Sequence, residues 1–217
     1  TLAISGETAT GLIELAEGGE VAFVLGYSDN DNPQTPAEDP SEMVMNTAFF
    51  GQAFAYDIEC VEEWHDPVVR SALALLAMTY FPSGGIVAAP TTSLPEKIGG
   101  IRNWDYRYTW LRDASFTMDA LLSLGESTVA LWFFEWLCRV CQTHWEQFQI
   151  MYRVDATPDI PEEELGHLKG YRESGPVRIG NGAANQSQHD IYGEVLSSAY
   201  ILAQTGHSVT EEHWNLL

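Results

Sequence analysis

Four segments of the chain carry apolar residues at the spacing of an α-helix. The predicted helices cover residues 66–80, 112–124, 127–140 and 185–204. Their apolar faces are broad and carry few charges, so each helix needs partners on more than one side. This feature restricts the chain to a layered, mainly helical assembly.

Local signals mark where these helices begin and end. Asp66 followed by Pro67 is typical of an N-cap and a first helical residue, and Gly125 is typical of the residue after a helix. Ser208 with Glu211 three residues later predicts a capping box and a fifth helix. Because this helix starts so close to residue 217, we expect the chain to be a segment of a longer protein.

The N-terminal part has a β pattern. Apolar segments at 11–15 and 21–27 flank Gly18 and Gly19, whose positive φ angles suit a tight turn. These segments predict two antiparallel strands. Residues 28–40 are rich in Asp, Asn and Pro and are expected to form a loop or linker.

Charge and cysteine content exclude several classes of function. The chain has 31 Asp and Glu against 10 Lys and Arg, a net charge of -21, which argues against nucleic acid and anionic membrane surfaces as partners. Such a surplus is typical of high-salt adaptation and also of an ordinary acidic mesophilic protein. No apolar run is long enough to span a membrane. Cys138 and Cys141 lie in an apolar helical stretch and are expected to be structural, and the histidines show no metal-ligand spacing.

A polar and aromatic cluster at residues 103–113 is the strongest candidate for a binding site. Four aromatic residues alternate with polar ones: Trp104, Tyr106, Tyr108 and Trp110. Alternation places side chains on one face of an extended loop, and aromatic faces stack on sugars. Arg112 beside Asp113 offers donors and acceptors for vicinal hydroxyl groups. The structural alternative, core aromatic residues and a local ion pair, is favoured by composition alone.

Two long motifs resemble a known family. They are IVAAPTTSLPEKIGGIRNWDYRYTWLRDASF at 86–116 and YRESGPVRIGNGAANQSQHDIYGEVL at 171–196. Both are similar to the bacterial and archaeal branch of the glucoamylase/trehalase family, glycoside hydrolase family 15, and the resemblance covers essentially the whole chain. It implies a mainly α fold. Residues 1–60 would be the end of an N-terminal antiparallel β-sandwich with a linker, and 61–217 the first part of an (α/α)6 barrel.

The resemblance also implies roles for individual residues. Arg112 and Asp113 would bind hydroxyl groups of the terminal, non-reducing glucose, and Tyr106 and Trp110 would shape the pocket. Further residues would lie on the same loop face: the loop 170–181, Gln186, Gln188 and Asp190. Within this loop, Arg178 and Asn181 either face the sugar or brace the loop, and both alternatives stay open. No metal or cofactor is expected.

The family cleaves an α-glucosidic bond with inversion, using one carboxylic acid and one carboxylate about 6.5–9.5 Å apart. The resemblance places both catalytic glutamates beyond Leu217. Glu162, Glu163 and Glu164 form a loop charge run that we expect to be solvated, and Glu194 lies inside a predicted helix. The expected catalytic residues are therefore absent from the 217 residues, and the chain alone is expected to be inactive.

Two classes of function remain. In the first, the chain is a segment of an exo-acting glycoside hydrolase that releases glucose from α-glucans or trehalose. In the second, it is a non-catalytic fragment, either truncated or carbohydrate-binding, that needs a partner to complete the barrel. The expected ligand is an α-linked glucose oligosaccharide or disaccharide. A second copy or a completing polypeptide is expected to cover the exposed apolar faces. A cytoplasmic location is favoured over secretion, and glucoamylase, trehalase and glucodextranase activities stay open.

Overall fold

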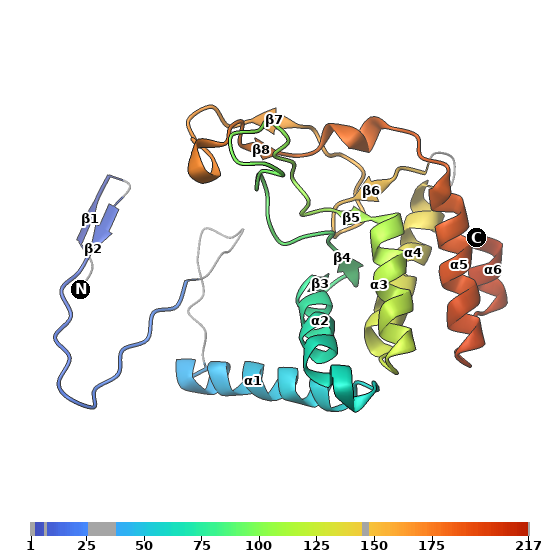
Figure 1. Ribbon diagram of the computed structural model, residues 1–217, viewed down its shortest axis with the longest axis horizontal. Helices are drawn as coiled ribbons and strands as arrows, with labels where there is room; N and C mark the ends of the chain where they lie inside the picture. Colours follow the sequence, from blue (N-terminus) through green and yellow to red (C-terminus); the bar gives the residue numbers. More distant parts are fainter. Residues whose placement is uncertain (1–2, 7, 26–37, 145–147, 217) are drawn as a thin grey trace. The chain divides into compact units, whose positions relative to one another are not determined.

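The computed structural model describes residues 3–6, 8–25, 38–144 and 148–216, and it is mainly helical (Figure 1). The chain divides into two compact units, Thr1–Ala53 and Phe54–Leu217. We describe each unit by itself. No helix among the described residues is long and apolar enough to cross a membrane.

The first unit contains one small antiparallel sheet. Strand β1 (Ala3–Ser5) pairs with β2 (Thr8–Thr10), and Ala3 lies opposite Thr10. The turn predicted at Gly18 forms, with the Gly19 N–H donating to the Ala16 carbonyl at 2.9 Å. The strands predicted beside it are wrong over the described residues 11–25, which contain none. Residues 26 and 27 of the second predicted strand lie outside the described residues.

A lack of covering layers explains this difference. Apolar side chains of both predicted strands are exposed, with Leu12 at 86% and Leu25 at 101%. A two-stranded ribbon that packs against nothing is marginally stable in water. The apolar segments beside Gly18 and Gly19 therefore predicted strands where, among the described residues, their side chains stay exposed.

Helix α1 (Pro40–Tyr56) was missed by the sequence analysis. It begins at an Asp-Pro pair, because the Asp39 carboxylate accepts a hydrogen bond of 2.8 Å from the Ser41 N–H and Pro40 is the first helical residue. Its large apolar residues are mostly exposed and do not form one buried stripe, so the helical period gives no signal. Residues 28–37 of the loop predicted before it lie outside the described residues.

The second unit is built on a group of packed helices. The 3-10 turn η1 (Glu62–Trp64) leads into α2 (His65–Ala77). Three long helices follow, α3 (Leu111–Ser123), α4 (Thr128–His144) and α5 (Asp190–Gln204), and the short α6 (Glu211–Leu216) comes last. Helix α3 packs against α4 and α5, and α4 also packs against α6 (Figure 1). The helices predicted in these regions are confirmed.

Two capping residues differ from the prediction. Asp66 lies inside the first turn of α2, and the residue at the N-cap position is Trp64. Thr210, not Ser208, caps α6: its Oγ1 accepts a hydrogen bond of 3.2 Å from the His213 N–H, and the Thr210 N–H donates to His213 Nδ1 at 3.3 Å. The capping box therefore exists two residues later, with an imidazole in place of the carboxylate.

The core lies where these helices meet. The apolar face predicted for α5 is buried: Ile191, Val195, Ala199 and Leu202. Cys138 and Cys141 are free and buried on α4. Burial raises the pKa of Cys138 to about 12 and that of Cys141 to about 11, so both remain thiols at neutral pH. Their predicted structural role agrees with this burial.

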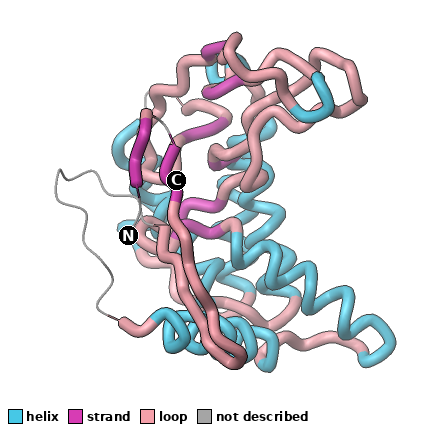
Figure 2. Tube along the Cα trace, turned by 90° about the vertical axis from the view of Figure 1, so that its left-hand side faces the viewer, coloured by secondary structure: helices cyan, strands magenta, loops and turns pink. Residues whose placement is uncertain are grey.

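Loops with short strands gather at the end of the helical group where α3 and α5 begin (Figures 1 and 2). The strands form antiparallel pairs: β3 (Thr79–Tyr80) with β4 (Gly85–Ile86), β5 (Thr109–Trp110) with β6 (Met151–Tyr152), and β7 (Glu163–Glu164) with β8 (Arg178–Ile179). Two 3-10 turns lie between β7 and α5: η2 (Tyr171–Glu173) before β8, and η3 (Gly182–Asn185) after it. Two long loops, residues 87–110 between β4 and α3 and residues 153–189 between β6 and α5, thus pack on each other and build one layer.

Candidate functional site

An open pocket of about 370 Å³ lies in the loop layer. Both long loops contribute to its lining: Trp104, Tyr106, Trp110, Glu162, Asn181, Gly182, Ala183 and Gln186. The rings of Tyr106 and Trp110 lie 5.8 Å apart with an interplanar angle of 45°. The pocket therefore has an aromatic wall from one loop and polar groups from the other.

The aromatic alternation predicted from sequence is confirmed in part. Trp104, Tyr106 and Trp110 line the pocket, and Trp110 is also part of the buried core. Tyr108 is buried as well, but it lies outside the lining, and its hydroxyl accepts a hydrogen bond of 3.1 Å from the Gly180 N–H. Burial and the nearby charges of Glu96 and Asp113 raise the pKa of Tyr106. The Tyr106 hydroxyl therefore stays protonated at neutral pH and can both donate and accept.

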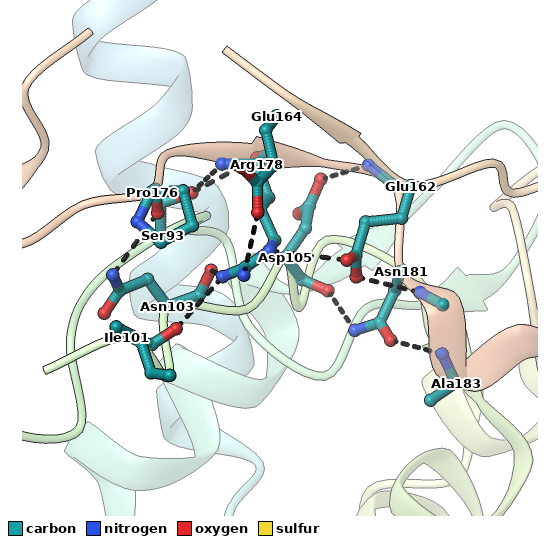
Figure 3. Close-up of polar contacts among 12 residues, drawn as sticks. Ser93, Ile101, Asn103, Asp105, Glu162, Glu164, Pro176, Arg178, Asn181 and Ala183 are labelled. Carbon is teal, nitrogen blue, oxygen red and sulfur yellow. Dashed lines mark hydrogen bonds and ion pairs between the residues drawn. The ribbon is translucent and has the colours of Figure 1, made fainter. Parts of the chain in front are cut away.

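Arg178 on β8 lies at the centre of the contact between the two loops (Figure 3). Its guanidinium donates to the carbonyls of Ile101 at 3.1 Å and Asn103 at 3.4 Å, and to the Glu164 carboxylate at 3.1 Å. Its Cζ lies 4.8 Å from the centre of the Trp104 ring. A buried guanidinium needs such partners, and here they tie the first loop to the second.

Asp105 forms a second buried contact between the loops. Its carboxylate accepts two hydrogen bonds from the Arg107 guanidinium, at 2.9 and 2.8 Å, and one of 3.2 Å from the Gly180 N–H. The bond to Asp105 raises the pKa of Arg107. Asn181 continues the network, because its Nδ2 donates to the Asp105 carbonyl at 3.0 Å and its Oδ1 accepts from the Ala183 N–H at 3.0 Å (Figure 3).

These contacts bear on the alternatives for Arg178 and Asn181, because each residue ties the two loops together. Both residues brace the loops, and Asn181 also lines the pocket. Gly180 between them has a φ of +76°, and a Cβ atom there would lie 1.7 Å from the Pro161 carbonyl oxygen. Only glycine allows this close approach.

Arg112 and Asp113 occupy the first turn of α3, immediately after the aromatic wall. The Arg112 guanidinium lies 3.2 Å from the Asp113 carboxylate and 3.2 Å from the carboxylate of Asp190 at the start of α5. It also donates to Gln188 Oε1 at 3.2 Å. Both members of each ion pair are partly exposed. The structure therefore joins the predicted residues of α3 to those predicted before α5.

Glu162 is the residue that sequence reasoning undervalued. It is solvent-accessible, as expected for a charge run, but its Oε2 accepts a hydrogen bond of 2.9 Å from the Gly182 N–H and it lines the pocket. Glu163 is exposed, and Glu164 pairs with Arg178. Glu162 lies immediately before β7 and Glu164 lies in it. Side chains two residues apart in an extended segment share one face, and this is the signal that could have found the two carboxylates.

The donor set of the site suits neutral polar ligands. In the described part of the chain, no group of three or more His, Cys, Asp or Glu residues is placed to hold a metal ion. The aromatic wall, a tyrosine hydroxyl, amide groups and one carboxylate are the groups that the pocket presents. Such a set stacks on a weakly polar ring and exchanges hydrogen bonds with hydroxyl groups.

Comparison with known proteins assigns the family. The family described as Glycosyl hydrolases family 15 matches residues 63–217. A trehalase of Mycolicibacterium smegmatis is 40% identical over 219 aligned residues, covering 100% of this chain and 33% of that protein. A trehalase of Mycobacterium tuberculosis is 38% identical, with 100% and 32% covered. A trehalase of Thermoplasma acidophilum is 42% identical over 154 residues, with 71% and 26% covered.

No solved structure matches the chain. The chain spans about a third of the length of the two mycobacterial relatives. The family match covers most of the chain and includes the aromatic wall, the Arg112–Asp113 pair and the loop with Arg178. The chain therefore belongs to glycosyl hydrolases family 15.

Proposed function

We propose that this chain is part of an exo-acting, inverting α-glucosidase that hydrolyses trehalose, and that its pocket binds one glucose unit of the substrate. Family membership and the trehalases among its relatives support this activity. The observation that carries the binding role is the aromatic wall formed by Trp104, Tyr106 and Trp110. Its faces suit the C–H groups of a pyranose ring.

The size and polarity of the pocket support a small sugar. A volume of about 370 Å³ lies at the lower end of the range for small-molecule sites. Tyr106 offers a protonated hydroxyl at the wall. A monosaccharide unit fits such a site better than a long, charged or wholly apolar ligand.

Arg112 and Asp113 are proposed to bind the hydroxyl groups of the same glucose unit. The Arg112 guanidinium is held between Asp113 and Asp190, 3.2 Å from each, and all three side chains remain partly exposed. A fork of N–H donors beside carboxylate acceptors matches a pair of adjacent hydroxyl groups, each of which donates and accepts. Holding Arg112 in advance lowers the entropic cost of binding.

The chemistry itself needs a carboxylic acid that protonates the leaving oxygen and a carboxylate that activates water on the opposite face of the sugar. We propose that both groups lie outside these 217 residues and that this chain supplies part of the glucose-binding site. On this proposal, the helices of the second unit are the first part of an (α/α)6 barrel. Residues 1–60 belong to the end of a preceding β-sandwich domain and its linker.

A titration with trehalose tests the proposal. Calorimetry with a longer protein that contains this chain and completes the site should detect binding of trehalose, and Tyr106→Ala should remove it because half of the Tyr106–Trp110 wall is lost. Trp132→Ala is the matched control, since Trp132 lies on α4 away from the lining of the pocket. Absence of binding by the wild-type longer protein, or unchanged binding by Tyr106→Ala, would overturn the proposed subsite. Release of glucose from trehalose by the chain alone would overturn the placement of the catalytic carboxylates.

A further inference from the structure

We infer that the Glu162 carboxylate is a substrate-binding group of this pocket that accepts hydrogen bonds from sugar hydroxyls, and that Arg178 is the residue that positions it. The inference deepens the proposed function and rests on it, because it requires that the pocket holds a sugar. It adds a residue that the family resemblance did not indicate.

The placement of Glu162 is the first argument. Among the described residues that line the pocket, Glu162 is the one with an ionisable carboxylate. Its side chain is 28% exposed, so most of its surface is removed from bulk water while the carboxylate still reaches the cavity. One oxygen is fixed by the Gly182 N–H at 2.9 Å.

The second argument concerns the acceptor capacity that is left. The other oxygen, Oε1, lies 3.3 Å from Arg178 Nε, but that buried nitrogen makes no hydrogen bond, so the pair is electrostatic and not directional. A carboxylate has about four acceptor sites on its two oxygens. Glu162 therefore keeps acceptor sites for hydroxyl donors within the pocket.

The other polar side chains of the pocket are more fully occupied. Both ends of the Asn181 amide are used, by the Asp105 carbonyl and by the Ala183 N–H. Gln186 Oε1 accepts from Gln188 Nε2 at 3.3 Å. A hydroxyl group entering the pocket consequently finds its strongest available acceptor in Glu162, because hydrogen bonds to charged groups are about twice as strong as neutral ones.

Arg178 fixes this acceptor. The guanidinium is held by the carbonyls of Ile101 and Asn103 and by Glu164, and it lies over the Trp104 ring. The same cation therefore contacts a wall residue of the pocket, Trp104. It also pairs with the pocket carboxylate, Glu162 (Figure 3). Its side chain is only 10% exposed, so it has little freedom to move. Its positive charge also offsets the cost of holding a carboxylate partly out of water.

Glu162→Gln tests the acceptor role, with trehalose and glucose as the probes and calorimetry as the measurement. The amide keeps the shape and one acceptor oxygen for the Gly182 N–H, but it loses the charge, so the Kd for trehalose should rise about tenfold or more. Glu163→Gln is the matched control, because its side chain is the exposed neighbour on β7, and its Kd should stay within about twofold of wild type. Thermal unfolding of both variants checks that the fold is retained.

Three outcomes separate the inference from the proposed function. If wild type binds neither sugar, the proposed function fails and the inference fails with it. If wild type binds trehalose and Glu162→Gln binds it equally well, only the present inference is overturned. If Glu162→Gln unfolds, Glu162→Asp replaces it, because aspartate keeps the charge but withdraws the carboxylate, and unchanged binding by this variant overturns the inference.

A double-mutant cycle tests the positioning role. Arg178→Lys should weaken trehalose binding several-fold in the wild-type background and have little further effect in the Glu162→Gln background, because the two residues act as a unit. If the fold-increases in Kd of the two single variants instead multiply in the double variant, Arg178 acts independently of Glu162, and its positioning role is overturned. Arg172→Lys on the same loop is the control, since Arg172 contacts only the Tyr171 ring among its described partners.

Discussion

The Arg178 guanidinium lies over the Trp104 ring, with its Cζ 4.8 Å from the ring centre. The two residues belong to different loops, separated by a long stretch of chain that includes α3 and α4. Their contact joins a wall residue of the pocket to the cation that pairs with Glu162 and Glu164. The shape of the pocket and the stability of the loop layer therefore depend on the same side chain.

Arg178→Ala should lower the free energy of unfolding of the second unit by about 3–5 kcal/mol. The variant leaves the Ile101 and Asn103 carbonyls and the Glu164 carboxylate without their partner. Urea denaturation followed by circular dichroism measures the change. Arg102→Ala, which removes an exposed pair with Glu96, should change the free energy by less than about 1 kcal/mol. Equal effects of the two variants would contradict the role of Arg178 in the loop contact.

Gly180→Ala should destabilise the loop layer strongly. The φ of +76° is unfavourable for alanine, and the new Cβ would lie 1.7 Å from the Pro161 carbonyl oxygen, so β7 and β8 would have to separate. We expect a clear drop in the thermal unfolding midpoint, together with weaker trehalose binding. Gly166→Ala on the same loop is the control, because no atom lies within 4 Å of its Cβ position. A stable Gly180→Ala variant would show that residues 161 and 180 do not approach so closely.

Asp113→Ala should abolish trehalose binding while the fold remains intact. The Asp113 side chain is 42% exposed and its ion pair with Arg112 contributes little to stability, about 0–1 kcal/mol. Calorimetry measures the binding, and thermal unfolding measures the stability. Asp119→Ala, at an exposed position on the same helix, should affect neither. Retention of binding by Asp113→Ala would remove this residue from the proposed subsite.

Alkaline pH should destabilise the second unit through its buried thiols. Burial raises the pKa of Cys138 from its ordinary value of about 9 to about 12. Since the folded state holds this proton more tightly than the unfolded state, its contribution to stability is complete below pH 9 and is lost as the pH rises toward 12. The loss approaches about 1.4 kcal/mol per pH unit in this window.

Denaturation curves between pH 8 and 11 provide the measurement. The decline in the free energy of unfolding should be shallower in Cys138→Ala than in wild type, since the variant has no thiol to ionise at this position. Cys60→Ala is the comparison, because Cys60 is only partly buried. Parallel curves for wild type and Cys138→Ala would show that the thiol does not ionise on unfolding.

The helices of the second unit were predictable because their signals are local. Apolar residues at helical spacing placed α3, α4 and α5 within a few residues of their true bounds, and the buried face of α5 was identified residue by residue. Helix α1 has the same Asp-Pro start but no one-sided apolar stripe, so periodicity could not reveal it. The strands predicted within residues 11–25 were wrong for the opposite reason: the apolar pattern was present, but those side chains stay exposed among the described residues.

The aromatic wall was also visible in the sequence, since Trp104, Tyr106 and Trp110 alternate along one short segment. Their neighbours in the pocket were not visible, because Glu162 and Asn181 come from a loop that follows two further helices. What the sequence by itself determined was the helical class, the aromatic motif and the family resemblance, all of which depend on neighbouring residues. Only the tertiary structure decided that Arg178 joins Trp104 to Glu162. That contact forms only when two loops that are far apart in the sequence pack together. The Arg178 guanidinium is buried there, and a buried charge needs partners, which both loops supply.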